Sequence, residues 1–283
     1  MPRTRAAVRR VEDQARRHYE NFPVASRLLP RRLRRPVAVI YAFARTADDI
    51  ADEGELGAGA RLARLDEYAR ELDALRRGET AADPLFAALA EIIGDFDLPL
   101  EPFDDLLAAF RQDVIKKRYN DFSELREYCR RSANPVGRLL LRLFRRDTEP
   151  NRAASDSLCT GLQLVNFLQD IEADLAKDRI YLPLDEMRRF GVTEDQIRQR
   201  RRDGAWRALI DLQLDRAREF LDAGAPLGKA LPGRVGLEAR LIRAGGARVL
   251  ARLRRWNAGA GGGTRLTRLD WVRMLITAVI RDS

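Results

Sequence analysis

The residues best placed for chemistry with a metal ion lie in the middle of the chain. On a helix, Asn166, Asp170 and Asp174 fall at i, i+4 and i+8, so their side chains line one face. Carboxylates stacked in this way repel one another, and unpaired charge among apolar residues costs several kcal/mol. We therefore expect a cation at this face. Ligands that are all oxygen atoms suit Mg²⁺, which keeps part of its water and shares its coordination shell with substrate phosphates.

The helix that carries this row is predicted to be long and buried on much of its circumference. Residues 160–183 read TGLQLVNFLQDIEADLAKDRIYLP, and Pro183 is the expected end of the helix. Gln163 and Gln169 lie on or beside the polar face, and Gln163 is a candidate for contact with a substrate. The apolar neighbours of the row are Leu162, Val165, Phe167, Leu168 and Ile171.

A second acidic helix is predicted from residues 41–53, which read YAFARTADDIADE. Asp48 and Asp52 are again four residues apart, and Arg45 precedes Asp48 by three positions, on the same face. Acidic pairs are usually solvated surface, so one such helix would be weak evidence. Two of them, each following an apolar run, favour metal ligands. The run before Asp48 comprises Val37, Val39, Ile40 and Phe43.

Together the two motifs resemble those of the squalene and phytoene synthase family. The matching pieces are DDIAD at 48–52 and NFLQDIEAD at 166–174, the latter followed by Arg179, Tyr181, Leu182 and Pro183. In that family two aspartate-rich motifs face each other across a helical cavity and hold Mg²⁺ ions that bind prenyl diphosphates. The resemblance runs from His18 to about Ala251 and implies a helical bundle of the isoprenoid synthase type with a central cavity. It implies as metal ligands Asp48, Asp52, Asn166, Asp170 and Asp174, with the four aspartates as the catalytic carboxylates.

The same resemblance implies a set of substrate-binding residues. The N-terminal segment HYENFP is similar to the one in which the family binds diphosphate and prenyl chain, which implicates His18 and Phe22. Residues 110–119 (FRQDVIKKRY) match a segment near the diphosphate, although Asp113 and Lys117 also fit an ordinary surface salt bridge. Arginine donates bidentately to phosphate oxygens. The remaining candidates are Tyr41, Arg45, Arg118, Tyr119 and Arg179.

Departures from the family pattern indicate which branch of the family the chain most resembles. Residues 128–137 (YCRRSANPVG) have Arg130 and Arg131 where familiar squalene synthases carry a tyrosine implicated in proton handling. The form SANPVGRLLL, with HYENFPVAS near the start, most resembles the bacterial hydroxysqualene synthases of hopanoid synthesis, which act on presqualene diphosphate and add water to the final cation. Asp178 stands where many relatives have glycine before Arg179.

Length and composition agree with an all-α protein. The 283 residues suffice for one large domain, predicted to span 1–283, and 45% hydrophobic with 34% charged residues suits amphipathic helices. No strand-like alternation and no internal repeat is present. Helices are predicted at 4–20, from Pro36 through the first acidic motif, 60–77, 84–94, 101–117, 121–131, 133–146, from the turn at 147–150 to Pro183, and at about 185–190, 194–201, 204–223, 235–257 and 266–281.

The composition also limits the cellular compartment and the cofactors that we expect for this protein. Two cysteines, Cys129 and Cys159, make no disulfide framework, so we expect a reducing cytoplasm. No run of 18 apolar residues and no signal-like core is present, so we expect a protein that is neither secreted nor membrane-spanning. A net charge of +9 leaves a peripheral membrane contact open. The glycine-rich residues 258–263 follow a predicted helix and lack the dinucleotide fingerprint, so we expect no nicotinamide site of that kind.

The sequence also admits functions other than water addition to presqualene diphosphate. The same acids would serve condensation of two prenyl diphosphates to presqualene diphosphate, squalene or phytoene. A non-catalytic relative acting as a membrane-associated assembly factor is disfavoured, because a scaffold has no reason to keep clustered acids. A basic nucleic-acid binder is disfavoured because the arginines are scattered through amphipathic helices without a recognition motif. We expect no nucleic-acid partner. The sequence leaves the number of metal ions and the oligomeric state open.

Overall fold

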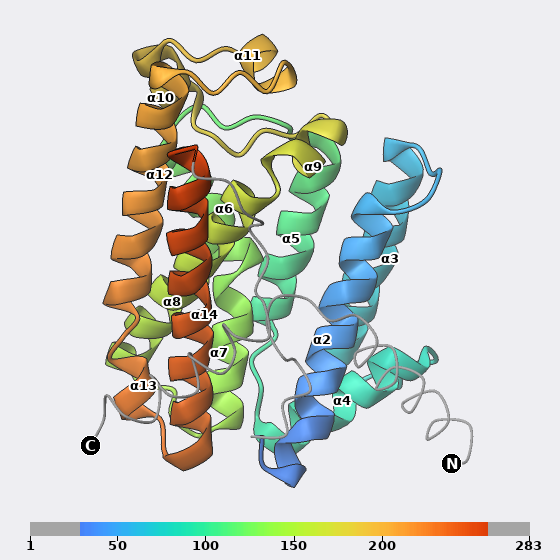
Figure 1. The fold of residues 1–283 in the computed structure, drawn as a ribbon. Helices are drawn as coiled ribbons and strands as arrows, with labels where there is room; N and C mark the ends of the chain where they lie inside the picture. The colour runs from blue at the N-terminus through green and yellow to red at the C-terminus, as the bar shows by residue number, and fades with distance from the viewer. Residues whose placement is uncertain (1–28, 260–283) are drawn as a thin grey trace. The chain divides into compact units, whose positions relative to one another are not determined.

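The computed structural model describes residues 29–259 (Figure 1). All regular secondary structure in this described part is α-helical, as predicted. The predicted helices at 4–20 and 266–281 lie outside the described residues, and so do His18 and Phe22. None of the helices between residues 29 and 259 is both long enough and apolar enough to cross a bilayer.

The chain forms two compact units that interleave along the sequence. Unit 1 comprises Met1–Ile115 and Pro135–Arg152, and unit 2 comprises Lys116–Asn134 and Ala153–Ser283. The first acidic motif belongs to unit 1 and the second to unit 2.

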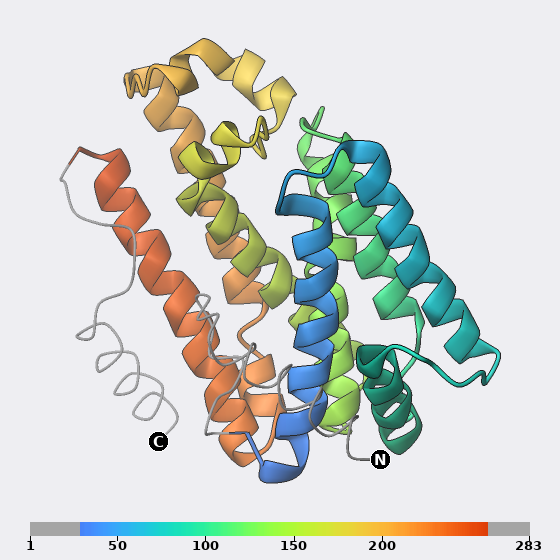
Figure 2. The same ribbon diagram turned by 90° about the vertical axis from the view of Figure 1, so that its right-hand side faces the viewer.

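Unit 1 is built on helix α2 (Arg31–Asp52), which contacts α3 (Ala58–Arg76), α4 (Pro84–Phe96) and α5 (Glu101–Ile115) (Figure 2). Most of α7 (Asn134–Leu143) also belongs to this unit. Phe43 is fully buried at the centre, with its ring edge-on to Phe86 at 5.9 Å and to Phe103 at 5.2 Å. Edge-to-face rings add about 0.5–1.5 kcal/mol to the stabilisation from burial alone. The acid-bearing helix is therefore anchored firmly in its unit.

Helix α2 begins earlier than predicted. Pro36 was expected to start the helix, but α2 begins at Arg31, with Pro30 as its N-cap and Pro36 inside it. A proline there removes only one ladder hydrogen bond close to the helix start. Leu33 and Pro36 are both buried, and their burial offsets that loss.

Unit 2 contains the remaining helices and most of α8 (Figure 1). The long helix α12 packs on both α14 and α10, and α11 contacts α9. A Cβ added at Gly161 would lie 2.9 Å from the backbone nitrogen of Leu221, so only glycine lets α8 approach α12 this closely. The helices of this unit are α6 (Phe122–Ser132), α8 (Glu149–Gln169), α9 (Ile171–Ala176), α10 (Leu184–Phe190), α11 (Glu194–Arg198), α12 (Gly204–Ala223), α13 (Leu227–Ala230) and α14 (Gly233–Asn257).

The prediction of one continuous helix through residues 160–183 is wrong. Helix α8 ends at Gln169, Asp170 has φ −106° and ψ 14°, and the short α9 then runs from Ile171 to Ala176. The chain leaves helical geometry seven residues before Pro183 because a turn closes after α9, so the proline is not what ends the helix.

Candidate active site

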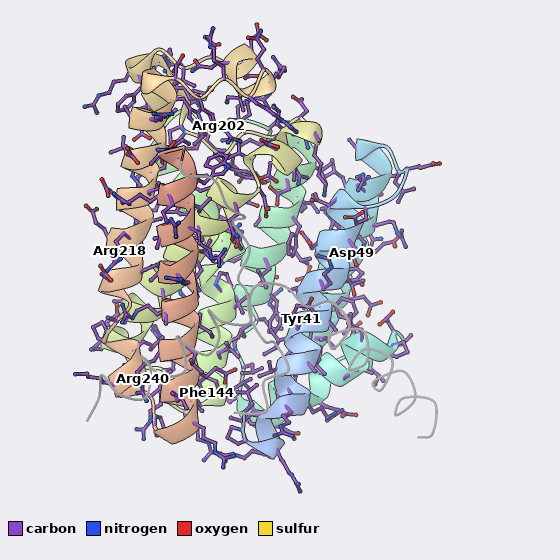
Figure 3. The ribbon with its side chains drawn as sticks, viewed as in Figure 1. Tyr41, Asp49, Phe144, Arg202, Arg218 and Arg240 are labelled. Atoms are coloured by element: carbon purple, nitrogen blue, oxygen red, sulfur yellow. The ribbon has the colours of Figure 1, made fainter. Side chains whose placement is uncertain are left out.

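The acidic face of α2 carries the predicted residues of unit 1. The Arg45 guanidinium is 3.3 Å from a carboxylate oxygen of Asp48 and 2.9 Å from one of Asp49. The Asp48 and Asp49 side chains are 38% and 32% exposed, so both remain reachable by an ion or ligand. Figure 3 labels Tyr41 and Asp49 on this helix. Asp49 is a partner of Arg45 that the sequence reasoning missed, although its i, i+4 spacing from Arg45 was a usable signal.

The second acidic motif lies across the break between α8 and α9. The amide of Asp170 donates to the Asn166 carbonyl at 2.9 Å, and the amide of Asp174 donates to the Asp170 carbonyl at 2.7 Å. The predicted four-residue spacing therefore persists through the break. The predicted burial on much of the helix circumference is confirmed for α8, where Leu164, Val165, Phe167 and Leu168 are buried, but not for α9, which contains no buried residue. Asp170, between the two helices, is exposed. Hydration at Asp170 weakens the repulsion between these carboxylates.

A tight corner follows α9 and connects Asp174 to Arg179. The amide of Arg179 donates to the Asp174 carbonyl at 2.8 Å, and the amide of Asp178 donates to the Leu175 carbonyl at 2.9 Å. Asp178 has φ +58°, the left-handed conformation that glycine favours at the end of a helix. This pair of hydrogen bonds is the Schellman arrangement. It joins the backbone of the buried Arg179 to that of Asp174, a candidate metal ligand five residues earlier.

Four aromatic rings from three segments of unit 2 gather near this corner. Tyr181 stacks on Phe167 with centroids 3.9 Å apart and an interplanar angle of 9°. Tyr119 and Tyr128 lie 5.7 Å and 5.8 Å from Tyr181. The stretch that carries Tyr119 runs beside the one that carries Tyr181, since the Ile180 amide donates to the Lys117 carbonyl at 3.0 Å. The cluster places four aromatic rings in the same unit as the second acidic motif, with Tyr119, Tyr128 and Phe167 buried and Tyr181 half-buried.

The guanidinium of Arg118 donates hydrogen bonds to several protein acceptors in unit 2. Its Nε and Nη2 donate to the two carboxylate oxygens of Glu194, each at 2.8 Å. Nη2 also donates to the Asp178 carboxylate at 2.9 Å, and Nη1 donates to the Lys117 carbonyl at 2.9 Å and to the Asp178 carbonyl. A guanidinium has five N–H groups, so each of them has an acceptor here.

These contacts shift the protonation equilibria of the partners. The hydrogen bond from Arg118 lowers the pKa of Glu194 despite its partial burial, and the same guanidinium lowers the pKa of Asp178. The bond to Glu194 raises the pKa of Arg118 in turn. All three groups are therefore charged at neutral pH. In contrast, burial raises the pKa of the Cys129 thiol to about 12, so this cysteine is not a nucleophile at neutral pH.

The outer face of α9 is held by a second set of cations. Arg200 lies 2.9 Å and Arg202 3.3 Å from carboxylate oxygens of Glu172. The Arg202 guanidinium also lies 3.7 Å from the ring centroid of Trp256 on α14. Helix α9 is thus tied through charged contacts to the segment after α11 and to α14.

The donor set of the two motifs fits Mg²⁺ chemically. Between residues 29 and 259, no group of three or more His, Cys, Asp or Glu side chains is close enough to hold a metal ion by itself. Mg²⁺ is usually bound through one or two carboxylates together with water and substrate phosphates. Oxygen-only pairs at four-residue spacing, as on α2 and across α8 and α9, can supply such ligands.

Within each unit the predicted site residues fall into local groups. In unit 1, Arg45 contacts Asp48 directly. In unit 2, Tyr119 lies in the aromatic cluster, and the Arg179 amide donates a hydrogen bond to the Asp174 carbonyl. Gln163 is half-buried on α8. The sequence reasoning assigned no site role to Tyr128, Phe167 or Tyr181, because stacking between distant segments leaves no periodic signal.

Comparison with known proteins gives consistent results. The family model described as Squalene/phytoene synthase matches residues 15–273. The chain is 38% identical to hydroxysqualene synthase of Rhodopseudomonas palustris, over 83% of this chain and 79% of that protein. It is 32% identical to phytoene synthase of Arthrospira platensis, over 71% of this chain and 69% of that protein.

Among solved structures, squalene synthase HpnC from Alicyclobacillus acidocaldarius is similar with a TM-score of 0.84 and 41% identity, over 91% of this chain and 97% of that one. The helical architecture, the acidic motifs and these matches lead to one assignment: the chain belongs to the squalene/phytoene synthase family.

Proposed function

We propose that this protein ionises presqualene diphosphate and adds water to the rearranged carbocation, giving hydroxysqualene. The observation that carries the proposal is in unit 2: the exposed Asp170 and the half-buried Asp174 at the α8–α9 break are followed, across the corner at Asp178, by Arg179 and the stacked Tyr181. The carboxylates and Arg179 suit a diphosphate, and the aromatic rings suit a carbocation on a hydrocarbon chain. The similarity to a hydroxysqualene synthase supports the choice of product.

The metal-binding role falls to the oxygen side chains of the two motifs. When bound, Mg²⁺ would neutralise the leaving diphosphate and orient it. Arg45 and Arg179 add charge-assisted hydrogen bonds, which strengthen as charge develops on the leaving oxygen. We propose as metal ligands Asp48, Asp52, Asn166, Asp170 and Asp174.

The remaining residues act on the hydrocarbon. Breaking the carbon–oxygen bond leaves the electron pair on the diphosphate and the positive charge on carbon. Aromatic faces attract a cation within about 6 Å, so the rings around Tyr181 are the candidate surface for the rearranging cation. Water then donates its oxygen to carbon and releases a proton to solvent. No reductant is consumed, in contrast to a hydride quench.

The test is the product formed from presqualene diphosphate. The purified protein with Mg²⁺ and no nicotinamide should release diphosphate and hydroxysqualene, with the hydroxyl oxygen labelled when the water is labelled with ¹⁸O. Adding reduced nicotinamide should leave the product unchanged. Squalene formed only with the nicotinamide, or untouched substrate with folded protein, would overturn the proposal.

The similarity to phytoene synthase supports a second candidate, condensation of two prenyl diphosphates. Supplying farnesyl or geranylgeranyl diphosphate alone tests it, because a condensing enzyme forms presqualene diphosphate, squalene or phytoene from these substrates. For a family member with a greasy substrate we further propose a cytoplasmic location with peripheral bilayer contact. A non-catalytic assembly factor would convert none of these substrates.

A further inference from the structure

The corner after α9 has an unusual residue at its most demanding position. Asp178 adopts φ +58°, where a side chain is strained and glycine is the common choice. The corner matters because its hydrogen bond from the Arg179 amide to the Asp174 carbonyl, at 2.8 Å, sets two candidate site residues relative to each other. Something must hold Asp178 in this conformation.

Arg118 supplies that restraint. Its guanidinium binds both the carboxylate and the backbone carbonyl of Asp178, so it fixes the side chain and the peptide plane together. Glu194 accepts two further hydrogen bonds at 2.8 Å and holds the guanidinium in position from α11. The Ile180 amide donates to the carbonyl of Lys117, the residue before Arg118, at 3.0 Å, and extends the attachment toward Tyr181.

The charges around Arg118 also argue against a direct contact with the substrate. Its single positive charge faces two carboxylates, and each of its five N–H groups has a protein acceptor. A diphosphate could bind this guanidinium only by displacing one of them. The other candidate arginine of unit 2 is Arg179, which is buried.

We propose that Arg118, Asp178 and Glu194 form a clamp that positions Asp174 and Arg179, and that Arg118 is a positioning residue rather than a diphosphate ligand. This inference deepens the proposed function and rests on it for the roles of Asp174 and Arg179. It replaces the expectation that Arg118 binds substrate.

The experiment compares Arg118→Gln, Glu194→Gln and the double variant. Amide hydrogen exchange is followed at residues 174–181 without metal or substrate, alongside kcat, KM and calorimetric binding of inorganic diphosphate with Mg²⁺. If the clamp exists, both single variants exchange about 10-fold or more faster in this segment and lose kcat by a similar factor. The double variant should be no worse than the more damaging single one, because both substitutions break the same unit.

The variant at Glu194 separates the two roles of Arg118. If Arg118 binds diphosphate directly, removing the nearby negative charge should leave diphosphate binding unchanged or tighten it. Arg118→Gln would then weaken that binding with exchange at 174–181 unaltered. That pair of results would overturn the clamp. Should Arg118→Gln fail to fold, Arg118→Lys keeps the charge without the planar fork and is expected to show the same faster exchange.

Arg198→Gln is the matched control. Arg198 pairs with the same Glu194 at 3.0 Å but is 51% exposed and bonds Asp195 rather than Asp178. It should leave exchange at 174–181 and kcat within about two-fold. The exchange measurement needs no substrate. Absence of turnover in the unsubstituted protein would therefore reject the proposed function, and the exchange rates at 174–181 would still decide whether the clamp exists.

Discussion

At the scale of single residues, the carboxylates assigned to the metal are accessible to water. Asp170 is exposed at the α8–α9 break and the Asp48 side chain is 38% exposed. Their charges therefore cost little in the metal-free protein, and a substitution there should act on chemistry more than on folding. This differs from a buried acidic row, which would strongly destabilise the empty site.

We therefore expect Asp48→Asn and Asp170→Asn each to abolish measurable turnover, a loss of about 10³-fold or more, because each removes a proposed metal ligand. The free energy of unfolding without metal should change by no more than about 0.5 kcal/mol, because repulsion between carboxylates is relieved and the partly exposed Arg45–Asp48 pair contributes little. Steady-state rates and chemical denaturation measure the two effects.

Glu219→Gln, on the exposed side of α12, is the control for a lost carboxylate and should keep its rate within about two-fold. Normal turnover in both aspartate variants would show that the metal ligands are assigned wrongly.

At the scale of elements, unit 2 depends on a buried ion pair between α10 and α12. Glu186 accepts hydrogen bonds from Arg216 at 2.5 Å and 3.0 Å and from Gln213 at 2.6 Å, and the Arg216 guanidinium lies 3.8 Å from the centroid of the Phe122 ring. The two charged side chains are only 12% and 16% exposed. Removing one partner leaves the other poorly solvated.

Glu186→Gln is accordingly expected to destabilise the protein by about 2–3 kcal/mol, somewhat less than the full cost of a broken buried pair because Arg216 keeps Gln213 and the ring. Burial raises the pKa of Glu186, but the hydrogen bonds from Arg216 and Gln213 outweigh it and the net shift is downward. A carboxyl with a depressed pKa stabilises the fold above its ordinary value of 4.5, and this contribution is lost as the pH falls below it.

Denaturation midpoints from pH 3 to 7 check both parts of this prediction. The variant should lose less stability than the unsubstituted protein as the pH falls below about 4.5, since that part of the acid dependence is gone. An equal loss in both proteins would contradict the assignment to Glu186. Arg218→Gln breaks an exposed pair with Asp222 on the same helix and should cost about 0.5 kcal/mol or less.

At the scale of the whole molecule, the two acidic motifs belong to different compact units, and the proposed function requires both. We expect Mg²⁺ with inorganic diphosphate to stabilise the protein by about 2.7 kcal/mol at a hundred-fold excess over Kd, a rise in Tm of roughly 5–10 °C. Hydrogen exchange should slow at 45–52 and at 166–179 together. Protection confined to one motif would contradict shared binding and the prediction of one functional domain.

Much of the fold could be predicted because helical periodicity is local. The helix at 204–223 was predicted to the residue, and the apolar run before Asp48 lies in the core as expected. Spacing alone selected the two acidic motifs, since residues four apart share a helix face wherever the helix lies. The short α13 was missed, because four residues carry too little pattern.

The sequence by itself therefore determined the helical class, the family and which oxygen-bearing side chains share a helix face, because these depend on residue type and on separations of three or four. Only the tertiary structure decided the surroundings of those residues. Arg118 meets Asp178 across 60 positions and Glu194 across 76, and Tyr181 stacks on Phe167 through a left-handed corner at Asp178. Such contacts depend on the path of the chain between their partners, and no local pattern encodes that path.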